Sequence, residues 1–221
     1  MATSLGRTRS PITYATPNLL ELAQIYSASR AEPLDLMSHD VWWQVIDDFC
    51  ISQDFRLELE KLAKQRVSDE DISLGTLSFL VDDGIAQMAV NLLPFFQNLV
   101  IKCGERGLIV AMRVSGKDAS SQWVRDVPRR RIVVHGKSSR ETVVLLHIPA
   151  LSLPKESILN VTGAGDTMVG SILASLLLQE ANAFSHPSLL DDIMHAAQQA
   201  AVLTLQDRRA VSPLLSSASS Y

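Results

Sequence analysis

The sequence predicts an α/β fold with a largely parallel sheet, and two features of its 221 residues predict it. Short apolar runs alternate with segments whose apolar residues recur at helical spacing, which is typical of strands that alternate with helices. A glycine-containing turn at 160–165 also leads without a break into a strongly apolar helix. A chain of this length can bury a sizeable core without a disulfide or a metal.

The first half of the chain is predicted to be mainly helical. Residues 12–15 form the end of a strand. Thr16 and Pro17 then begin a helix, because threonine is a suitable N-cap and proline fits the first helical position. An acidic loop is expected at 67–76. Further helices, indicated by their apolar spacing, are expected at 41–50, 55–64 and 82–95.

Strands and two further helices are predicted after residue 98. Apolar runs expected to form strands lie at 99–102, 108–114, 132–135 and 142–147. A turn at 104–107 separates the first two runs, and loops rich in serine, glycine and arginine separate the others. Helices are expected at 166–180 and 188–205. The polar residues 1–10 and the Ser/Ala-rich residues 216–221 are expected to be disordered.

Composition and charge argue against several classes of protein. The net charge of −4 and the pI of about 5.7 argue against a general nucleic-acid binder, which would carry a basic excess. Cys50 and Cys103 form neither a zinc pattern nor a disulfide framework, which is typical of a reducing compartment. No apolar run reaches the roughly 20 residues of a membrane span. We therefore expect a cytoplasmic chain with no nucleic-acid or membrane partner. Arg7 and Arg9, with no acidic residue before Glu21, leave a mitochondrial transit peptide as the alternative.

The most informative segment is the turn Asn-Val-Thr-Gly-Ala-Gly-Asp at 160–166. Gly163 and Gly165 let the backbone approach a ligand closely. The helix that follows directs its free N–H groups and about half a positive charge at the same spot, so the turn is a candidate anion site. Asp166 adds a carboxylate at the edge, which suits a general base in phosphoryl transfer to a hydroxyl. The alternative is an ordinary glycine turn with Asp166 as an N-terminal helix residue.

Two other phosphate-binding patterns do not fit. Gly163, Gly165 and Gly170 are too widely spaced for the dinucleotide fingerprint Gly-x-Gly-x-x-Gly, which disfavours a dinucleotide-binding enzyme. Gly116 and Lys117 are followed by aspartate instead of serine or threonine, so they do not form a P-loop.

Residues 160–173 closely resemble the C-terminal signature of the ribokinase-like, or PfkB, carbohydrate kinases. Asn18 and Glu21 resemble the Asn-x-x-Glu motif of that family, and the strand end that leads into the Gly-x-x-Gly of 104–107 resembles its nucleotide-binding turn. The three motifs occur in the family's order. The resemblance implies a three-layer ribokinase-like sandwich with a mainly parallel central sheet. It also implies an ATP-dependent phosphotransferase that needs Mg²⁺ and acts on an alcohol group of a sugar or nucleoside.

The resemblance implies a role for each matching residue. Asp166 would take the proton of the acceptor hydroxyl, beside an anion hole formed by Gly163, Ala164 and Gly165. Glu21 would organise Mg²⁺ through water, which is reasonable because magnesium keeps several waters and few carboxylates. The residues implied in ATP binding are Asn18, Lys102, Gly104, Glu105, Gly107 and Ala197. The alanines around Ala197 are explained equally well by close helix packing.

The chain departs from the family pattern at several positions. Asn160 and Thr162 would form a monovalent-cation site, which is weakened because family members often have aspartate at the first of these positions. Residues 34–75 form a long insertion with two extra helical patterns. The insertion and the approach to the signature at 151–162 most resemble pseudouridine kinases. Such kinases are sometimes fused to a pseudouridine-5′-phosphate glycosidase, which would then be a fused or associated partner.

The largest departure is an absence. Family members place the acceptor-sugar site and a small β-sheet lid before the Asn-x-x-Glu motif, whereas Asn18 stands almost at the start of this chain. We therefore expect residues 11–215 to form a partial kinase domain that lacks the N-terminal substrate half. The alternative to a kinase is a truncated, non-catalytic nucleotide-binding or interaction fragment. The apolar face left uncovered would make the chain marginally soluble or promote a homodimer.

Overall fold

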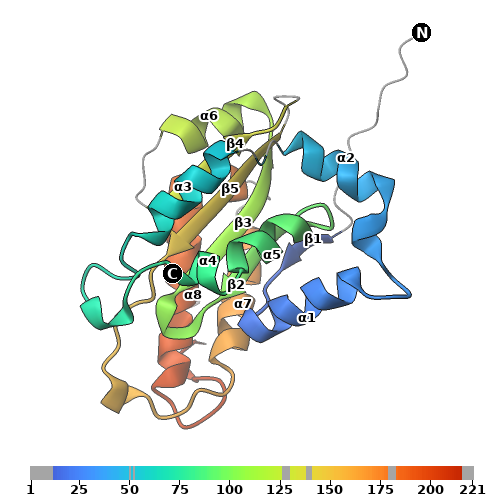
Figure 1. Cartoon of the computed structure of the whole chain (residues 1–221). Helices are drawn as coiled ribbons and strands as arrows, with labels where there is room; N and C mark the ends of the chain where they lie inside the picture. The colour runs from blue at the N-terminus through green and yellow to red at the C-terminus, as the bar shows by residue number, and fades with distance from the viewer. Residues whose placement is uncertain are drawn as a thin grey trace.

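A mixed sheet forms the middle layer of the molecule (Figure 1). In the part of the chain that the structure describes, its strands are β1 (Ile12–Ala15), β2 (Phe96–Lys102), β3 (Leu108–Ser115), β4 (Arg131–His135) and β5 (Glu141–Ile148). They lie in the order β1-β2-β3-β5-β4. The computed structural model describes residues 12–49, 51, 53–125, 130–137, 141–178 and 183–215. Cys50 and the predicted disordered segments 1–10 and 216–221 lie outside these residues.

The prediction of a mainly parallel sheet is wrong. Among the described strands only β1 and β2 pair in parallel, whereas β2–β3, β3–β5 and β4–β5 pair antiparallel. The length of the connections explains the difference. The short turn at 104–107 joins β2 to β3 and permits only an antiparallel pair. Between β1 and β2 the chain passes through several helices, which is the long crossover that a parallel pair needs.

The helices of the first half cover one face of the sheet (Figure 1). They are α1 (Leu19–Arg30), α2 (Asp40–Asp48), α3 (Gln53–Ala63), α4 (Phe79–Asp82) and α5 (Ile85–Leu92). Their buried apolar side chains pack on Leu99, Ile101 and Ile109. The two helices predicted between residues 41 and 64 are confirmed. The helix predicted at 82–95 is interrupted, because Gly84 adopts a φ of 68° where α4 ends and α5 begins.

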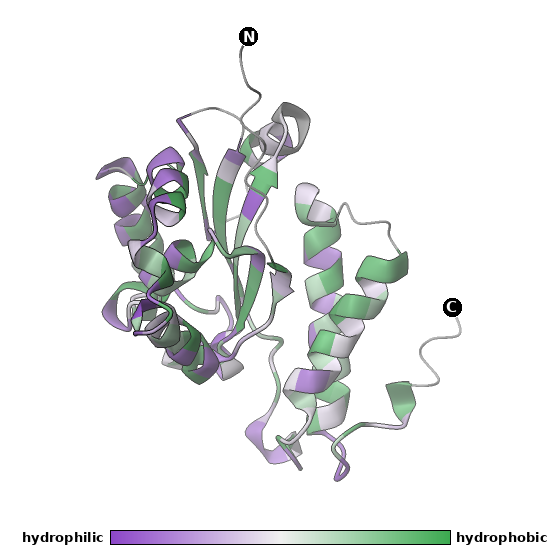
Figure 2. Ribbon diagram, turned by 90° about the vertical axis from the view of Figure 1, so that its right-hand side faces the viewer, coloured by the Kyte–Doolittle hydropathy of each residue, from purple (hydrophilic) through white to green (hydrophobic). Residues whose placement is uncertain are grey.

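The opposite face of the sheet is covered by α6 (Lys117–Arg125), α7 (Ala164–Leu178) and α8 (Pro187–Leu205). Figure 2 shows α7 and α8 on the side of the sheet away from the earlier helices. Their apolar side chains pack on Val110, Met112 and Val144, so each face of the sheet has its own core. The α/β class and the three-layer arrangement are therefore confirmed. None of the described helices has both the length and the apolar character of a membrane span.

Helix α6 lies in a segment that the sequence predicts to be loop. Its serines and charged residues outweigh its few apolar positions, so no helical apolar pattern is evident. Trp123 nevertheless anchors it in the core, because the indole is fully buried and its Nε1–H donates to the carbonyl oxygen of Phe184 at 3.1 Å. The helix is also tied to β5, because the Thr142 hydroxyl donates to Ser120 Oγ at 2.9 Å.

Candidate functional site

A pocket of about 450 Å³ lies where the end of β2, the start of α7 and the last turns of α8 come together. It brings together residues that the sequence analysis selected from two separate motifs: Lys102, Gly104, Glu105, Gly107, Ala164 and Gly165. The apolar side chains of Val202 and Leu205 line it as well. A concave, mostly apolar pocket with a few convergent polar groups is the usual form of a small-molecule site.

The turn that follows β2 has a backbone that glycine makes possible. Gly104 and Gly107 adopt φ values of 60° and 88°, which are costly for residues with a side chain. The turn is closed by the Cys103 N–H, which donates to the Gly107 carbonyl at 2.8 Å, and by the Gly107 N–H, which donates to the Gly104 carbonyl at 3.0 Å. A Cβ on Gly107 would overlap the carbonyl oxygen of Ile148. The turn therefore passes directly against the neighbouring backbone after β5.

His147 of β5 supports this turn from the protein interior. The ring is 2% exposed, and its Nε2 lies 2.7 Å from the carbonyl oxygen of Arg106. Because a carbonyl oxygen only accepts, Nε2 must carry the proton. The buried Nδ1 has no partner among the described residues. Burial lowers the pKa of His147 from 6.5 to about 4, so the ring is neutral near pH 7.

The signature turn begins α7 on the other side of the pocket. Gly163 adopts a φ of 84°, and a Cβ there would overlap the carbonyl oxygen of Ala210. The Thr167 N–H donates to the Gly163 carbonyl at 2.8 Å, which leaves the N–H groups of the first helical turn without helical acceptors. Ala164 and Gly165 of this turn line the pocket. The helix N-terminus is thus exposed to a ligand in the pocket, as an anion site requires.

Lys102 connects the three sequence motifs. Its backbone N–H donates to the carbonyl oxygen of Pro17 at 2.8 Å, just before Asn18. Its side chain extends towards the signature turn, where a Cβ on Gly165 would lie 3.5 Å from Nζ. Lys102 therefore adds a full positive charge to the partial positive charge of the helix N-terminus. This combination is suited to the phosphate groups of a nucleotide.

The Asn-x-x-Glu motif forms the N-terminal cap of α1. Asn18 is the N-cap, which corrects the prediction that Thr16 caps this helix. The Glu21 N–H donates to Asn18 Oδ1 at 2.9 Å, and the Asn18 N–H donates to Glu21 Oε2 at 2.7 Å. This reciprocal pair is a capping box, and it accounts for the motif on structural grounds. Neither residue lines the pocket, although both begin the helix next to Lys102.

The donor groups near the site fit magnesium only as an ion that keeps most of its waters. Glu21 is exposed and uses Oε2 in the capping box. The described residues contain no cluster of three or more histidine, cysteine, aspartate or glutamate side chains that could hold a metal. A single carboxylate with water and substrate phosphates is an ordinary donor set for Mg²⁺. It does not suit a metal that needs an all-protein cage.

Asp166 lies on the exposed side of the first turn of α7. It follows Gly165 directly but does not line the pocket itself. A carboxylate in this turn is stabilised by the positive end of the helix. The structure thus places an exposed carboxylate directly after Gly165, a residue that lines the pocket.

Comparison with known proteins agrees with this geometry. The sequence pattern of the pfkB family carbohydrate kinase matches residues 76–217, a stretch that contains both turns of the pocket. The chain belongs to the pfkB family of carbohydrate kinases. Asn18 and Glu21 lie outside the matched residues.

This pfkB family chain is similar to one curated protein and to one solved structure. It is 28% identical over 205 residues to the pseudouridine-metabolizing bifunctional protein of Schizosaccharomyces pombe, a match that covers 91% of this chain and 23% of the relative. The chain thus spans about a quarter of the length of that curated relative. It is also similar to the crystal structure of fructokinase from Vibrio cholerae O395 in a form with bound fructose, ADP and calcium ion. That likeness has a TM-score of 0.39 and 12% identity over 95% of this chain and 61% of the other.

The remaining residues selected from the sequence lie apart from the pocket of the pfkB family chain. Ala197 is fully buried in the core between α7, α8 and the sheet, so packing accounts for it. Ala201, one turn further along α8, lines the pocket instead. Asn160 and Thr162 lie in the loop before α7, where the Thr162 N–H donates to Asn160 Oδ1 at 2.9 Å.

Several residues that line the pocket were not selected from the sequence. Ser68 and Asp71 come from the predicted acidic loop, and Lys155 from the segment before the signature. Hydrogen bonds from Ser73, together with the positive charge of Lys155, lower the pKa of Asp71. Gln198 fixes the segment after β5, because it donates to the Pro149 carbonyl at 3.1 Å and accepts from the Leu151 N–H at 2.9 Å. No local pattern marks these residues, since only the fold brings them to the pocket.

Proposed function

We propose that this chain carries the nucleotide half of an ATP-dependent phosphotransferase that acts on an alcohol group of a sugar or nucleoside. The observation that carries the proposal is the meeting of Lys102, the 104–107 turn and Gly165 at one pocket. Membership of the pfkB family supports the same reaction class. The chain spans about a quarter of its curated relative, so the whole activity is part of the proposal.

In this proposal the residues act mainly by positioning and by charge. The N–H groups of the turn Gly163–Gly165 and the Lys102 ammonium stabilise negative charge on the transferring phosphoryl group. Gly104 and Gly107 let the backbone pass close to the nucleotide. Asp166 accepts the proton of the acceptor hydroxyl as the hydroxyl oxygen bonds to the γ-phosphorus of ATP, the bond from that phosphorus to the bridging oxygen breaks, and ADP leaves.

Magnesium would lie near Glu21, through water, and would neutralise charge on the nucleotide phosphates when bound. Glu21 itself orients water and holds the start of α1 through its capping box. Its carboxylate has one oxygen in the cap, so its contribution to an ion is small and indirect.

The proposed acceptor is pseudouridine or a related nucleoside or sugar. The support is the likeness to a protein whose name describes it as pseudouridine-metabolizing and bifunctional. A pseudouridine-5′-phosphate glycosidase, fused or associated, is the corresponding proposed partner. A cytoplasmic location also remains a proposal.

Isothermal titration with ATP and Mg²⁺ tests the nucleotide site directly. Gly165→Val should weaken binding about ten-fold or more, because a branched side chain there fills the space beside Lys102 Nζ. Gly170→Val is the matched control on the same helix, since a Cβ at Gly170 meets nothing within 4 Å. Equal binding by the Gly165→Val variant and the parent would contradict the proposal.

The alternative is a nucleotide-binding or interaction fragment without catalysis. An assay of ADP release over a panel of pseudouridine, uridine, ribose and fructose separates the two. Acceptor-dependent release from this chain alone supports a complete kinase. ATP binding without release supports the fragment, because transfer requires an acceptor held in line with the phosphate and that positioning is worth roughly 7–11 kcal/mol.

A further inference from the structure

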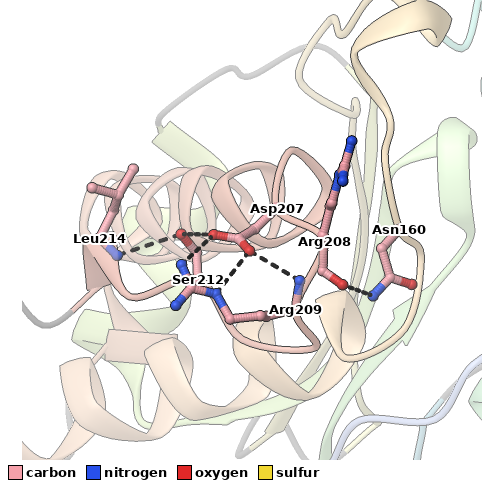
Figure 3. A network of polar contacts seen from close by, with 6 residues as sticks. All are labelled: Asn160, Asp207, Arg208, Arg209, Ser212 and Leu214. Atoms are coloured by element: carbon pink, nitrogen blue, oxygen red, sulfur yellow. Dashed lines mark hydrogen bonds and ion pairs between the residues drawn. The ribbon is translucent and has the colours of Figure 1, made fainter.

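The segment after α8 folds back against the signature turn and is held there by Asn160 (Figure 3). The Leu159 and Asn160 N–H groups donate to the carbonyl oxygen of Leu205 at 2.8 and 3.2 Å. The Asn160 side chain contacts the loop that follows α8, since its Nδ2 donates to the carbonyl oxygen of Arg208 at 3.3 Å. Gly163 approaches the carbonyl of Ala210 so closely that a side chain would overlap it. The loop at 207–210 thus packs directly against the signature turn.

Hydrogen bonds to the Asp207 carboxylate stabilise this loop internally. Asp207 Oδ1 accepts from the Arg209 N–H at 2.9 Å and from Arg209 Nε at 3.1 Å, and Asp207 Oδ2 accepts from Ser212 Oγ at 3.4 Å. The hydrogen bonds from Arg209 lower the pKa of Asp207. Figure 3 shows this network directly beside Arg208 and Asn160. The Arg208 carbonyl is therefore presented by a structured loop.

The Asn160 side chain satisfies a donor and an acceptor at the same time. Its Oδ1 accepts from the Thr162 N–H at 2.9 Å, so the amide oxygen must face that donor. The amide nitrogen consequently faces the Arg208 carbonyl, which can only accept. An ionised aspartate here would match Thr162 but would place a second oxygen against the carbonyl. Such an oxygen pair is unfavourable unless a cation lies between them.

The residues present therefore do not fit the monovalent-cation site expected at Asn160 and Thr162. The side chain at position 160 presents an N–H donor to the Arg208 carbonyl, where a cation would need a second oxygen acceptor. We propose that the Asn160 amide takes the place of a monovalent cation in this chain. It ties the 207–210 loop to the signature turn by a hydrogen bond, so the turn keeps its geometry without potassium or sodium.

The ATP-binding readout of this inference rests on the proposed function. Thermal unfolding tests the role of Asn160 independently of the nucleotide site. Unfolding midpoints and ATP affinity are measured in potassium, sodium and choline chloride at equal ionic strength. The parent should give the same values in the three salts. Asn160→Ala should lower the midpoint by about 2–4 °C in every salt, because both hydrogen bonds of the Asn160 side chain are lost and no charge is created.

Asn160→Asp is the decisive variant. It should be less stable than the parent in choline and should regain stability in potassium, because the carboxylate then recruits a cation between itself and the carbonyl. A parent that is stabilised by potassium relative to choline, or an Asn160→Asp variant that is indifferent to the salt, overturns the inference. Failure of every variant to bind ATP counts against the proposed function alone, since the unfolding midpoints still decide the role of Asn160.

Discussion

Lys102 Nζ lies 3.5 Å from the point that a Cβ on Gly165 would occupy. The end of β2 and the start of α7, which are far apart in the sequence, therefore both direct positive charge into the same region of the pocket. Lys102 alone could be explained as an ordinary lysine at a strand end, and Gly165 alone as an ordinary residue of a helix turn. Their contact makes the pocket suitable for phosphate.

Lys102→Met should weaken ATP binding about ten-fold to a hundred-fold, because a charge-assisted hydrogen bond to phosphate is lost. Adenosine, which carries no phosphate, should bind equally to the parent and the variant. Titration calorimetry with both ligands measures the difference. Lys64→Met, at an exposed lysine outside the pocket, controls for the change in net charge. A loss of the same size for adenosine would mean that Lys102 supports the fold and not the phosphates.

Asp166→Asn should leave ATP affinity within about two-fold of the parent, since the residue is exposed and does not line the pocket. In any preparation that shows acceptor-dependent ADP release, the variant should be about 10²–10⁴-fold slower, because asparagine cannot take the hydroxyl proton. Single-turnover rates and binding isotherms on the same samples check both parts. Activity within a few-fold of the parent would assign the base elsewhere.

Gly163→Ala should destabilise the chain by about 1–3 kcal/mol, because the residue has a φ of 84° and its Cβ would overlap the Ala210 carbonyl. Gly170→Ala should instead stabilise α7 by about 0.5–1 kcal/mol, because its Cβ would meet nothing and alanine favours helices. Urea unfolding of both variants gives the comparison. Changes of the same sign would show that the close approach of the 207–210 loop is not maintained in solution.

The free energy of unfolding should fall as the pH is lowered from about 6.5 to about 4. Burial lowers the pKa of His147 to about 4, so between these values the unfolded chain takes up a proton that the folded chain does not. The contribution is on the order of 3 kcal/mol at about 1.4 kcal/mol per pH unit. Urea midpoints across this range measure it.

His147→Gln should flatten this pH dependence, whereas His195→Gln, at an exposed histidine on α8, should leave it unchanged. The glutamine amide can still donate to the Arg106 carbonyl, so the turn at 104–107 has a substitute for the ring N–H. A pH profile that is identical in parent and His147→Gln would locate the acid sensitivity in other groups.

The outward side of α7 should promote self-association. Leu173, Leu177 and Leu178 are 48%, 84% and 83% exposed. Leu173 and Leu177 are four residues apart and so lie on the same side of the helix, which makes the exposed apolar surface contiguous there. Sedimentation velocity over a concentration series should show dimers that Leu177→Glu dissociates. Leu57→Glu, at a leucine that is 51% exposed on α3, should leave the dimer intact. A parent that remains monomeric at high concentration would contradict the prediction.

The local elements of the fold were largely predictable because their signals are local. Glycine placement and apolar spacing predict the turns at 104–107 and 160–165 and the helix at 188–205. Helix α6 was missed because its large buried anchor, Trp123, is an isolated side chain without an evident helical pattern around it. The split between α4 and α5 was missed because Gly84 interrupts an apolar pattern that otherwise continues.

The sequence by itself determined which residue types could bind an anion, where the glycine turns lie, and that helices alternate with strands. These features depend on backbone freedom and on the period of apolar residues over short stretches. Only the tertiary structure decided that most strand pairs are antiparallel and that Ala201, not Ala197, lines the pocket. It also decided that the Asn160 amide faces the Arg208 carbonyl. Those outcomes depend on contacts between residues far apart along the chain, and such contacts are determined by how the layers pack together.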